Sequence, residues 1–220
     1  MLTFYYHPLS PIARRVWLAL LEKALPFEPV IVNLTGEQFQ ADFLAISPFH
    51  HVPVLIDDGQ RILESLAILT YLEAQYPTLS LSPSEPRAIA RMSMVQMVTV
   101  NELTTKLPAL VLASEASGFD EPLSQHLATV LSFLDQQLGG AAFFGGDRLS
   151  LADITAGATF PLLKRLGVEW QTYPAIAAWF ERITARPAWQ QTEPDEADFA
   201  IWKRWILLMI KRRQRQLART

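Results

Sequence analysis

The stretch LTFYYHPLSPIARRVWLALLEKA, residues 2–24, decides the fold because it joins a strand pattern directly to a helix pattern. Its first part, 2–6, is rich in β-forming residues and ends before Pro8, which predicts a buried strand. Ser10 precedes Pro11, and a serine N-cap followed by proline at the first helical position is typical of a helix start. Apolar residues then recur at helical spacing, at Ile12, Val16, Trp17, Leu20, Leu21 and Ala24.

The same alternation continues to residue 77 and completes a small α/β domain, 1–77, with the order β-α-β-α-β-β-α. After the first strand and helix, the patterns predict a strand at 30–32, a helix at about 37–45, a hairpin of 52–56 and 61–63, and a helix at 65–75. Proline and serine dominate the next stretch, so we expect a linker at 78–87. The order of strands and helices predicts a small α/β domain.

The rest of the chain shows helical periodicity and no convincing strand pattern. Helices are predicted at 88–107, 123–138, 151–166 and 176–184, which gives an all-α domain at 88–198. Ser150 lies three residues before Asp153 at the head of an apolar helix, a variant of the capping box that favours folding. The predicted fold class is therefore α/β plus all-α, followed by a basic apolar tail or helix at 199–220.

The composition of the chain excludes several kinds of chemical site. The chain has 220 residues, of which 50% are apolar and 19% charged, so it has enough apolar surface to fold. It contains no cysteine, which excludes disulfides, thiolate zinc sites and a cysteine nucleophile. No secretory pattern is visible at 1–6, so we expect a cytoplasmic location. Three histidines, His7, His50 and His51, lack helical spacing, and we expect no metal.

The charge of the chain is divided unevenly along its length. Residues 1–202 hold 12 basic and 22 acidic side chains, a net charge of about −10, whereas seven basic and no acidic residues follow. The apolar run in the tail is about half of the ~20 residues that a membrane span needs. We expect the tail to fold back on the acidic body. Contact of the tail with an anionic membrane and disorder of the tail are the less favoured alternatives, and no nucleic-acid partner is expected.

Three segments of the first domain converge at one edge of its sheet, where open α/β folds place ligands. They are the loop after the first strand, 6–10, the turn 51–53, and the pair Glu64-Ser65 at the head of a helix. If the Val52-Pro53 bond is cis, the backbone of Val52 can pair with an extended peptide. A helix N-terminus at Ser65 suits a carboxylate, and Glu64 suits an ammonium group. Together these features describe a site for a small γ-linked peptide.

These motifs, in this order, resemble the cytosolic glutathione S-transferases over about residues 1–195, and the Ser-Pro helix start is most similar to the serine-type classes such as tau, phi and theta. The resemblance implies a thioredoxin-like fold for domain 1–77, glutathione as co-substrate, a small hydrophobic electrophile, a detoxifying role and a homodimer. It implies that Ser10 is catalytic and that Ser150 and Asp153 form a folding cap. The implied glutathione-binding residues are His51, Val52, Pro53, Glu64 and Ser65.

Some positions depart from the family pattern or allow another role. Serine-type members often have Gly-Lys or Gly-Gln before the Val-Pro pair, whereas this chain has His50-His51. Tyr5 and Tyr6 end the first strand, so either is an alternative activator of the thiol. Arg14 and Arg15 are expected on a solvated face or in a structural ion pair. The hydrophobic substrate pocket is predicted from Tyr6, Leu9, Met94, Met97 and Val98, with Trp202 or Trp205 as further candidates.

Conjugation of the glutathione thiolate to a small hydrophobic electrophile is the first functional hypothesis. The second keeps glutathione but uses it for isomerisation, dehalogenation or disulfide reduction. The third is a non-catalytic glutathione-binding or scaffold protein that makes its contacts through the basic tail.

Overall fold

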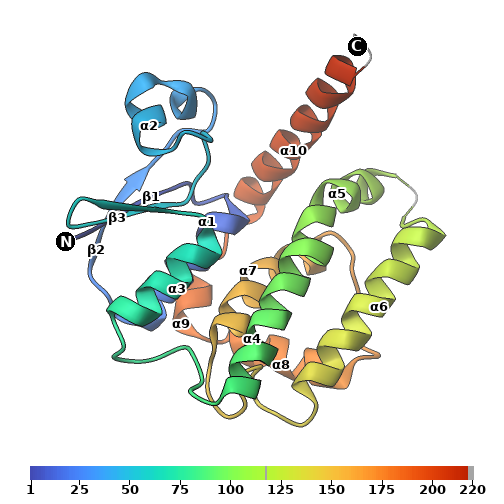
Figure 1. Cartoon of the computed structure of the whole chain (residues 1–220). Coiled ribbons are helices and arrows are strands. Elements are labelled where there is room, and N and C mark those ends of the chain that lie inside the picture. The colour runs from blue at the N-terminus through green and yellow to red at the C-terminus, as the bar shows by residue number, and fades with distance from the viewer. Residues whose placement is uncertain (117, 218–220) are drawn as a thin grey trace.

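The structure is a computed structural model that describes residues 1–116 and 118–217, and its two domains lie side by side (Figure 1). The first is the predicted thioredoxin-like domain with the predicted order of strands and helices. Its elements are β1 (Leu2–Tyr6), α1 (Pro11–Glu22), β2 (Phe27–Ile31), the 3₁₀ turn η1 (Glu37–Phe39), α2 (Ala41–Ile46), β3 (Val54–Asp57), β4 (Gln60–Leu63) and α3 (Ser65–Gln75).

The sheet has the strand order β2-β1-β3-β4, in which β1 and β2 are parallel and the other pairs antiparallel. Its register fixes the edge at which the predicted site lies. Tyr5 pairs with Val54, and Val54 pairs in turn with Leu63. The residues one step beyond these three are Tyr6, Pro53 and Glu64, so the three predicted segments do meet at one edge of the sheet.

The strands and helices of this domain pack in layers around β1. Figure 1 shows α1 and α3 on one side of the sheet and α2 on the other. Leu2, Phe4 and Tyr6 are buried, as the alternation of a strand requires. The strand β2 begins three residues earlier than predicted, and its Pro29 is tolerated because β2 is an edge strand.

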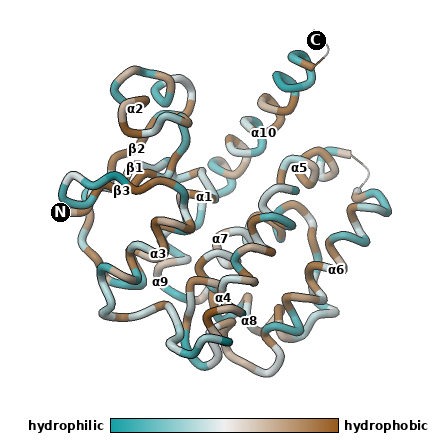
Figure 2. Tube along the Cα trace, in the orientation of Figure 1, coloured by the Kyte–Doolittle hydropathy of each residue, from teal (hydrophilic) through white to brown (hydrophobic). Residues whose placement is uncertain are grey.

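The second domain is helical, as predicted, and in Figure 2 the hydrophobic residues lie mainly where its helices face one another. Its elements are α4 (Pro86–Val98), the π-helix η2 (Thr99–Leu103), the 3₁₀ turn η3 (Thr104–Lys106), α5 (Leu107–Glu115), α6 (Glu121–Leu138), α7 (Leu151–Arg165), α8 (Pro174–Thr184), α9 (Pro187–Thr192) and α10 (Glu196–Leu217).

The segment predicted as one helix over 88–107 is longer and interrupted. It runs from α4 to α5 and changes to π and 3₁₀ geometry between Thr99 and Lys106. Pro108 explains the change, because proline has no N–H to donate to the carbonyl four residues earlier, which belongs to Thr104. The interruption turns Thr104 toward the first domain, where its hydroxyl group contacts a residue of α1.

Helix α1 joins the two domains because it packs on both sides. It contacts α3 in its own domain and α7 and α9 in the second. Glu22 near its end accepts two hydrogen bonds from Arg186, at 2.9 and 2.5 Å. The buried apolar residues of both domains form one continuous cluster. Residues 76–85, all described, run between α3 and α4 without helix or strand, and the exact domain limits stay a prediction.

The tail forms the helix α10. Only the first half of this helix folds back on the body of the protein, as the sequence predicts for the whole tail. Phe199 and Trp202 are buried, and Lys203 pairs with Glu115 of α5 at 2.5 Å. Residues 211–217 are exposed on a part of the helix that projects from the body (Figure 1). The apolar run stops at Ile210, so this basic end has no apolar face to bury. Arg219 lies outside the described residues, and no helix of the part described is long and apolar enough to span a bilayer.

Candidate active site

Ser10 caps the first helix of the thioredoxin-like domain. Its Oγ accepts a hydrogen bond from the backbone N–H of Ala13 at 3.2 Å, and Pro11 occupies the first turn. The side chain is half-buried. Among the residues that the structure describes, none accepts the hydroxyl hydrogen of Ser10. A serine in this state can still donate that hydrogen to a ligand beside the helix N-terminus.

The turn before β3 is held by Ser47. Its hydroxyl group donates to the carbonyl of His51 at 2.8 Å and accepts from the N–H of His51 at 3.1 Å. The Val52-Pro53 peptide bond that follows is cis. Val52 and Pro53 are buried, whereas His51 is exposed beside His50, with ring centroids 5.7 Å apart. The turn therefore presents a fixed backbone next to the exposed ring of His51.

Glu64 and Ser65 begin α3 at the same edge of the sheet. Glu64 is exposed and has φ of +66°, a backbone conformation that costs a residue other than glycine about 1–3 kcal/mol. Residues held in such conformations concentrate at ligand sites. Ser65 is buried and occupies the first position of α3. The geometry places an exposed carboxylate beside a helix N-terminus, which favours an anion.

The two arginines of α1 are both buried, so the expected solvated face is wrong. Arg14 forms an ion pair with Glu193 at 2.6 Å, which is the other arrangement expected from the sequence. Arg15 meets no carboxylate among the described residues and bonds instead to the hydroxyl groups of Ser65 and Thr104. The second domain covers the outer side of α1, and this is why neither guanidinium reaches water.

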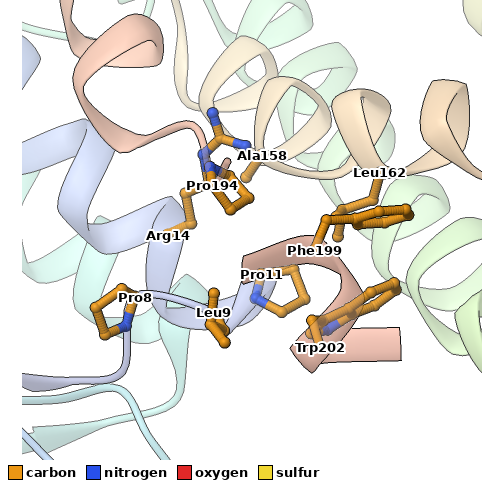
Figure 3. Close-up of a pocket in the computed structure, with 9 residues that line it drawn as sticks. All are labelled: Pro8, Leu9, Pro11, Arg14, Ala158, Leu162, Pro194, Phe199 and Trp202. Carbon is orange, nitrogen blue, oxygen red and sulfur yellow. The ribbon is translucent and has the colours of Figure 1, made fainter. Parts of the chain in front are cut away.

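Of the predicted pocket residues, Leu9 and the further candidate Trp202 line a cavity. Figure 3 shows the side chain of Leu9 beside those of Pro11, Phe199 and Trp202. The cavity has a volume of about 10 Å³, enough for about one water molecule. The beginning of α10 therefore closes the space below the loop that carries Ser10.

The aromatic residues around this loop are packed together. Tyr6 is buried and stacks on Phe4 at 4.8 Å, and burial raises its pKa. A raised pKa opposes the formation of a phenolate, and Tyr5 lies half-buried on the other face of the strand. His7 packs on Trp205 of α10 at 4.9 Å, and its Nδ1 accepts from the N–H of Leu9 at 3.1 Å. Helix α10 thus touches the loop on which Ser10 lies.

The methionines of α4 lie elsewhere. Met94 and Met97 are 42% and 49% exposed, and Val98 is half-buried. None of these three side chains lines the cavity at Leu9. Their predicted place in the substrate pocket stays a prediction. In the described part of the chain no three His, Cys, Asp or Glu side chains are grouped so that they could hold a metal ion.

The cap of the second domain is fully formed. Asp153 is buried and accepts hydrogen bonds from the N–H of Ser150 at 2.8 Å and from its hydroxyl group at 2.7 Å. It also accepts from the N–H of Phe144 at 2.9 Å and from Nε1 of Trp179 at 2.8 Å. Burial raises the pKa of Asp153, and these hydrogen bonds oppose that effect. The motif is therefore a packing centre that joins α7, α8 and the loop before them.

A thioredoxin-like domain with a serine at the head of its first helix, followed by a helical domain, defines a class of two-domain transferases. Residues 4–84 match the family described as "Glutathione S-transferase, N-terminal domain", and residues 94–187 match "Glutathione S-transferase, C-terminal domain". The chain belongs to the glutathione S-transferase family. The family, the fold and the transferase function expected from the sequence are confirmed.

Individual relatives cover most of the chain. It is similar to glutathione S-transferase 3 of Zea mays, with 33% identity over 87% of this chain and 92% of that one. It is also similar to the maleylacetoacetate isomerase of Pseudomonas aeruginosa, with 31% identity over 86% of this chain and 93% of that one. A solved delta-class glutathione transferase of Nilaparvata lugens has a TM-score of 0.80 and 26% identity, and the match covers 95% of this chain and all of that one.

Arg15 and Thr104 are the residues near the site that the sequence did not indicate. A buried arginine without a carboxylate has no signature in a single sequence. The signal for Thr104 was weak but present, since Pro108 lies four residues later in a segment that was predicted as one helix.

Proposed function

We propose that the protein conjugates the thiolate of glutathione to small hydrophobic electrophiles and that Ser10 stabilises the thiolate. One observation carries the proposal: the half-buried hydroxyl group of Ser10 lies at a helix N-terminus with its hydrogen uncommitted among the described residues. The sheet register brings the cis Val52-Pro53 pair and Glu64-Ser65 to the same edge.

A single serine at a helix N-terminus can supply the free energy needed to ionise the glutathione thiol. A free thiol has a pKa of about 8.5, and lowering it by about two units requires about 2.7 kcal/mol in favour of the anion. A hydrogen bond donated to a charged group contributes about 1.5–3 kcal/mol, and a helix N-terminus adds about 0.3–1 kcal/mol. Ser10 can therefore supply this stabilisation together with α1.

Ionisation alone accelerates the reaction little. At pH 7 a decrease of two pKa units gives about 25-fold more thiolate, but the lower basicity reduces its reactivity about eightfold. The net gain is about threefold, so most of the acceleration must come from holding the electrophile next to the sulfur. We assign Leu9 to the wall that holds it. The cavity at Leu9 is nearly full, so Phe199 and Trp202 must move if it is to accept more than a few atoms.

The tripeptide is placed by the three other groups at the sheet edge. The backbone of Val52 pairs with the cysteinyl residue as an added strand would. Ser65 and the N-terminus of α3 receive the α-carboxylate of the γ-glutamyl group, and Glu64 receives its ammonium group. His51 is assigned to the glycine carboxylate. Its exposed position beside the fixed turn supports this assignment.

We further propose a cytoplasmic homodimer with a role in detoxification, as the family resemblance implies. The exposed face of α4 supports the dimer, because Met94 and Met97 lie three residues apart and present apolar side chains to solvent. Sedimentation equilibrium of the wild type and of Met94→Glu tests it. Dissociation of a wild-type dimer by the substitution is expected, and a monomeric wild type contradicts the proposal.

Calorimetric titration with glutathione tests the binding site. Wild-type protein is expected to bind, and Glu64→Ala to bind about tenfold more weakly, because the ammonium group loses a charged partner. Glu85→Ala is the control, since Glu85 also occupies an N-cap position, that of α4, but lies outside the sheet edge. Equal binding by the wild type and the Glu64 variant would show that the γ-glutamyl group lies elsewhere.

Isomerisation is the second candidate, because one relative of comparable identity is a maleylacetoacetate isomerase. A substrate panel that includes an aryl halide, a cis-enone acid and a mixed disulfide separates conjugation from isomerisation, dehalogenation and disulfide reduction. A protein that fails to bind glutathione at millimolar concentration would instead be a scaffold, and removal of 211–220 would then abolish partner binding.

A further inference from the structure

Helix α10 carries positive charge that the rest of the protein does not neutralise. Of its six basic residues, Lys203 pairs with Glu115, and the other five form no ion pair with a described residue. These five, all exposed, are Arg204, Lys211, Arg212, Arg213 and Arg215. No acidic residue follows Asp198 in the sequence. Like charges four positions apart, such as Lys211 and Arg215, destabilise a helix, so α10 gains stability from an anionic partner.

One side of α10 combines most of these cations with exposed apolar side chains. Its residues recur three or four positions apart, the spacing that aligns side chains along one side of a helix. We call this side the basic stripe, and it consists of Ile201, Arg204, Leu208, Lys211, Arg212 and Arg215. Ile201 and Leu208 are 44% and 46% exposed. Apolar and cationic groups are therefore interleaved on one surface that faces solvent.

The basic stripe lies opposite the side of α10 that packs on the body of the protein. Phe199 and Trp202 are buried on that side, and Ile206 is half-buried. At 3.6 residues per turn, these three residues lie about 160° around the helix from the centre of the stripe. Residues 211–217 project from the body (Figure 1). A flat partner can therefore meet the stripe without displacing Phe199 or Trp202.

The mixture of side chains in the stripe distinguishes between classes of anionic partner. Phosphate groups attract Lys and Arg in lipid headgroups and in nucleic acids alike. A nucleic-acid backbone would leave Ile201 and Leu208 in water, whereas the boundary between lipid headgroups and acyl chains accepts apolar side chains beside cations. Met209, next to the stripe, is 56% exposed and adds another apolar side chain. The composition of the stripe therefore favours a lipid surface.

We propose that the basic stripe of α10 binds the surface of membranes that contain anionic lipids. The cations of the stripe meet lipid phosphate and carboxylate groups, and Ile201 and Leu208 enter the boundary beneath them. Residues 1–202 have a net charge of about −10 and are repelled by the same surface, so the contact is confined to α10. The inference goes beyond the proposed function and does not depend on glutathione as the ligand.

Both kinds of side chain should contribute to binding. Each Lys or Arg near an anionic membrane strengthens binding about fivefold, and this effect weakens as salt rises. An apolar side chain that leaves water for the lipid boundary contributes about fivefold to tenfold. Attraction by charge alone would not depend on Leu208, so the apolar contribution separates insertion into lipid from simple attraction to a polyanion.

Co-sedimentation of the full chain with vesicles tests the proposal. The vesicles consist of phosphatidylcholine alone or with about one third phosphatidylserine, in about 0.1 M salt. The wild type is expected to sediment only with the vesicles that contain phosphatidylserine. Arg212→Gln/Arg215→Gln should bind them about 25-fold more weakly, because the stripe loses two charges. Leu208→Gln keeps every charge and should still bind about fivefold more weakly.

Arg87→Gln/Arg148→Gln is the matched control. Both arginines are exposed on other parts of the second domain, at the start of α4 and in the loop before α7. The control changes the net charge by the same amount as the stripe variant, and it should bind vesicles as the wild type does. Equal losses in the control and in the stripe variant would reduce the effect to net charge and overturn the inference.

Other results also overturn it. A wild type that does not sediment with phosphatidylserine vesicles has no lipid-binding surface. A Leu208→Gln variant that binds like the wild type excludes insertion into lipid. Tighter binding of the wild type to duplex DNA than to the vesicles would assign the stripe to nucleic acid. Self-association without vesicles that is lost in Arg212→Gln/Arg215→Gln would assign it to a second copy of the chain.

Discussion

In the part of the chain that the structure describes, two helices have a serine as their N-cap, and the two regions use it differently. Ser150 at the head of α7 is 1% exposed, and its hydroxyl group donates to Asp153 at 2.7 Å. Ser10 at the head of α1 is half-buried, and its oxygen accepts from the N–H of Ala13. The residue three positions after the serine makes the difference. An aspartate takes up the hydroxyl hydrogen, whereas an alanine leaves it available.

The comparison shows that an N-cap motif does not by itself assign a role. At α7 the motif is closed by a carboxylate that also binds Phe144 and Trp179, so its purpose is stability. At α1 the hydroxyl hydrogen of the cap has no acceptor among the described residues, and the cap lies at the sheet edge that we propose receives glutathione. A structural cap and a hydroxyl group proposed to be catalytic thus share one local sequence signal.

Removal of the closing carboxylate should have the largest effect. We expect Asp153→Ala to destabilise the protein by about 3–5 kcal/mol, because buried donors of Ser150, Phe144 and Trp179 lose their acceptor. Denaturant unfolding followed by tryptophan fluorescence measures the change. A loss below about 1 kcal/mol would show that water or another group replaces the carboxylate.

Ser10→Ala should change the ionisation of the glutathione thiol. Loss of a hydrogen bond donated to the thiolate is expected to raise the pKa of bound glutathione by about 1–2 units, because the anion loses about 1.5–3 kcal/mol of stabilisation. Conjugation should therefore fall about threefold at pH 7 and recover at pH 9, where the thiol ionises without help. Ultraviolet titration of the bound thiolate and a pH–rate profile measure both. An unshifted thiolate titration would assign the activation to another group, with Tyr5 next to be tested.

Ser150→Ala should weaken the fold moderately and leave the chemistry unchanged. The expected loss is about 0.5–2 kcal/mol, smaller than for Asp153, because the carboxylate keeps its other donors. The thiolate titration should match that of the wild type. A shifted titration would mean that the two serines are not independent, contrary to the contrast drawn between them.

Ser10→Thr should have the smallest effect. Threonine keeps the hydroxyl group and serves nearly as well as an N-cap, so the pKa of the bound thiol should change by less than about half a unit. Conjugation measured beside Ser10→Ala gives the comparison. A loss as large as that of the alanine variant would show that space near the sulfur matters more than the hydroxyl hydrogen.

The sequence predicted the features that depend on residues close to one another along the chain. The strand and helix order of the first domain, the Ser10 cap and the Ser150-Asp153 motif all follow from local patterns. The interrupted helix at Thr99–Lys106 and the short helix α9 were missed, because their geometry depends on Pro108 and on packing between distant segments.

Arg15 shows most clearly what could not be predicted from a single sequence. Residues 14 and 15 lie about 100° apart on a helix, so one of them could reach solvent on an exposed side of α1. Neither residue faces the exposed side of α1, because α3 and the interrupted helix cover Arg15 while α9 covers Arg14. A single sequence does not show that a second domain will cover a helix of the first, and the charge at Arg15 could not be placed without the structure.

The position of α1 between the two domains also affects how the protein unfolds. This helix packs on α3 in its own domain and on α7 and α9 in the second, so the two domains cannot separate without loss of its contacts. The buried apolar residues of both domains also form one cluster. Heating should therefore melt both halves in one calorimetric peak, and a fragment that ends at residue 77 should be a poor stand-in for the intact chain.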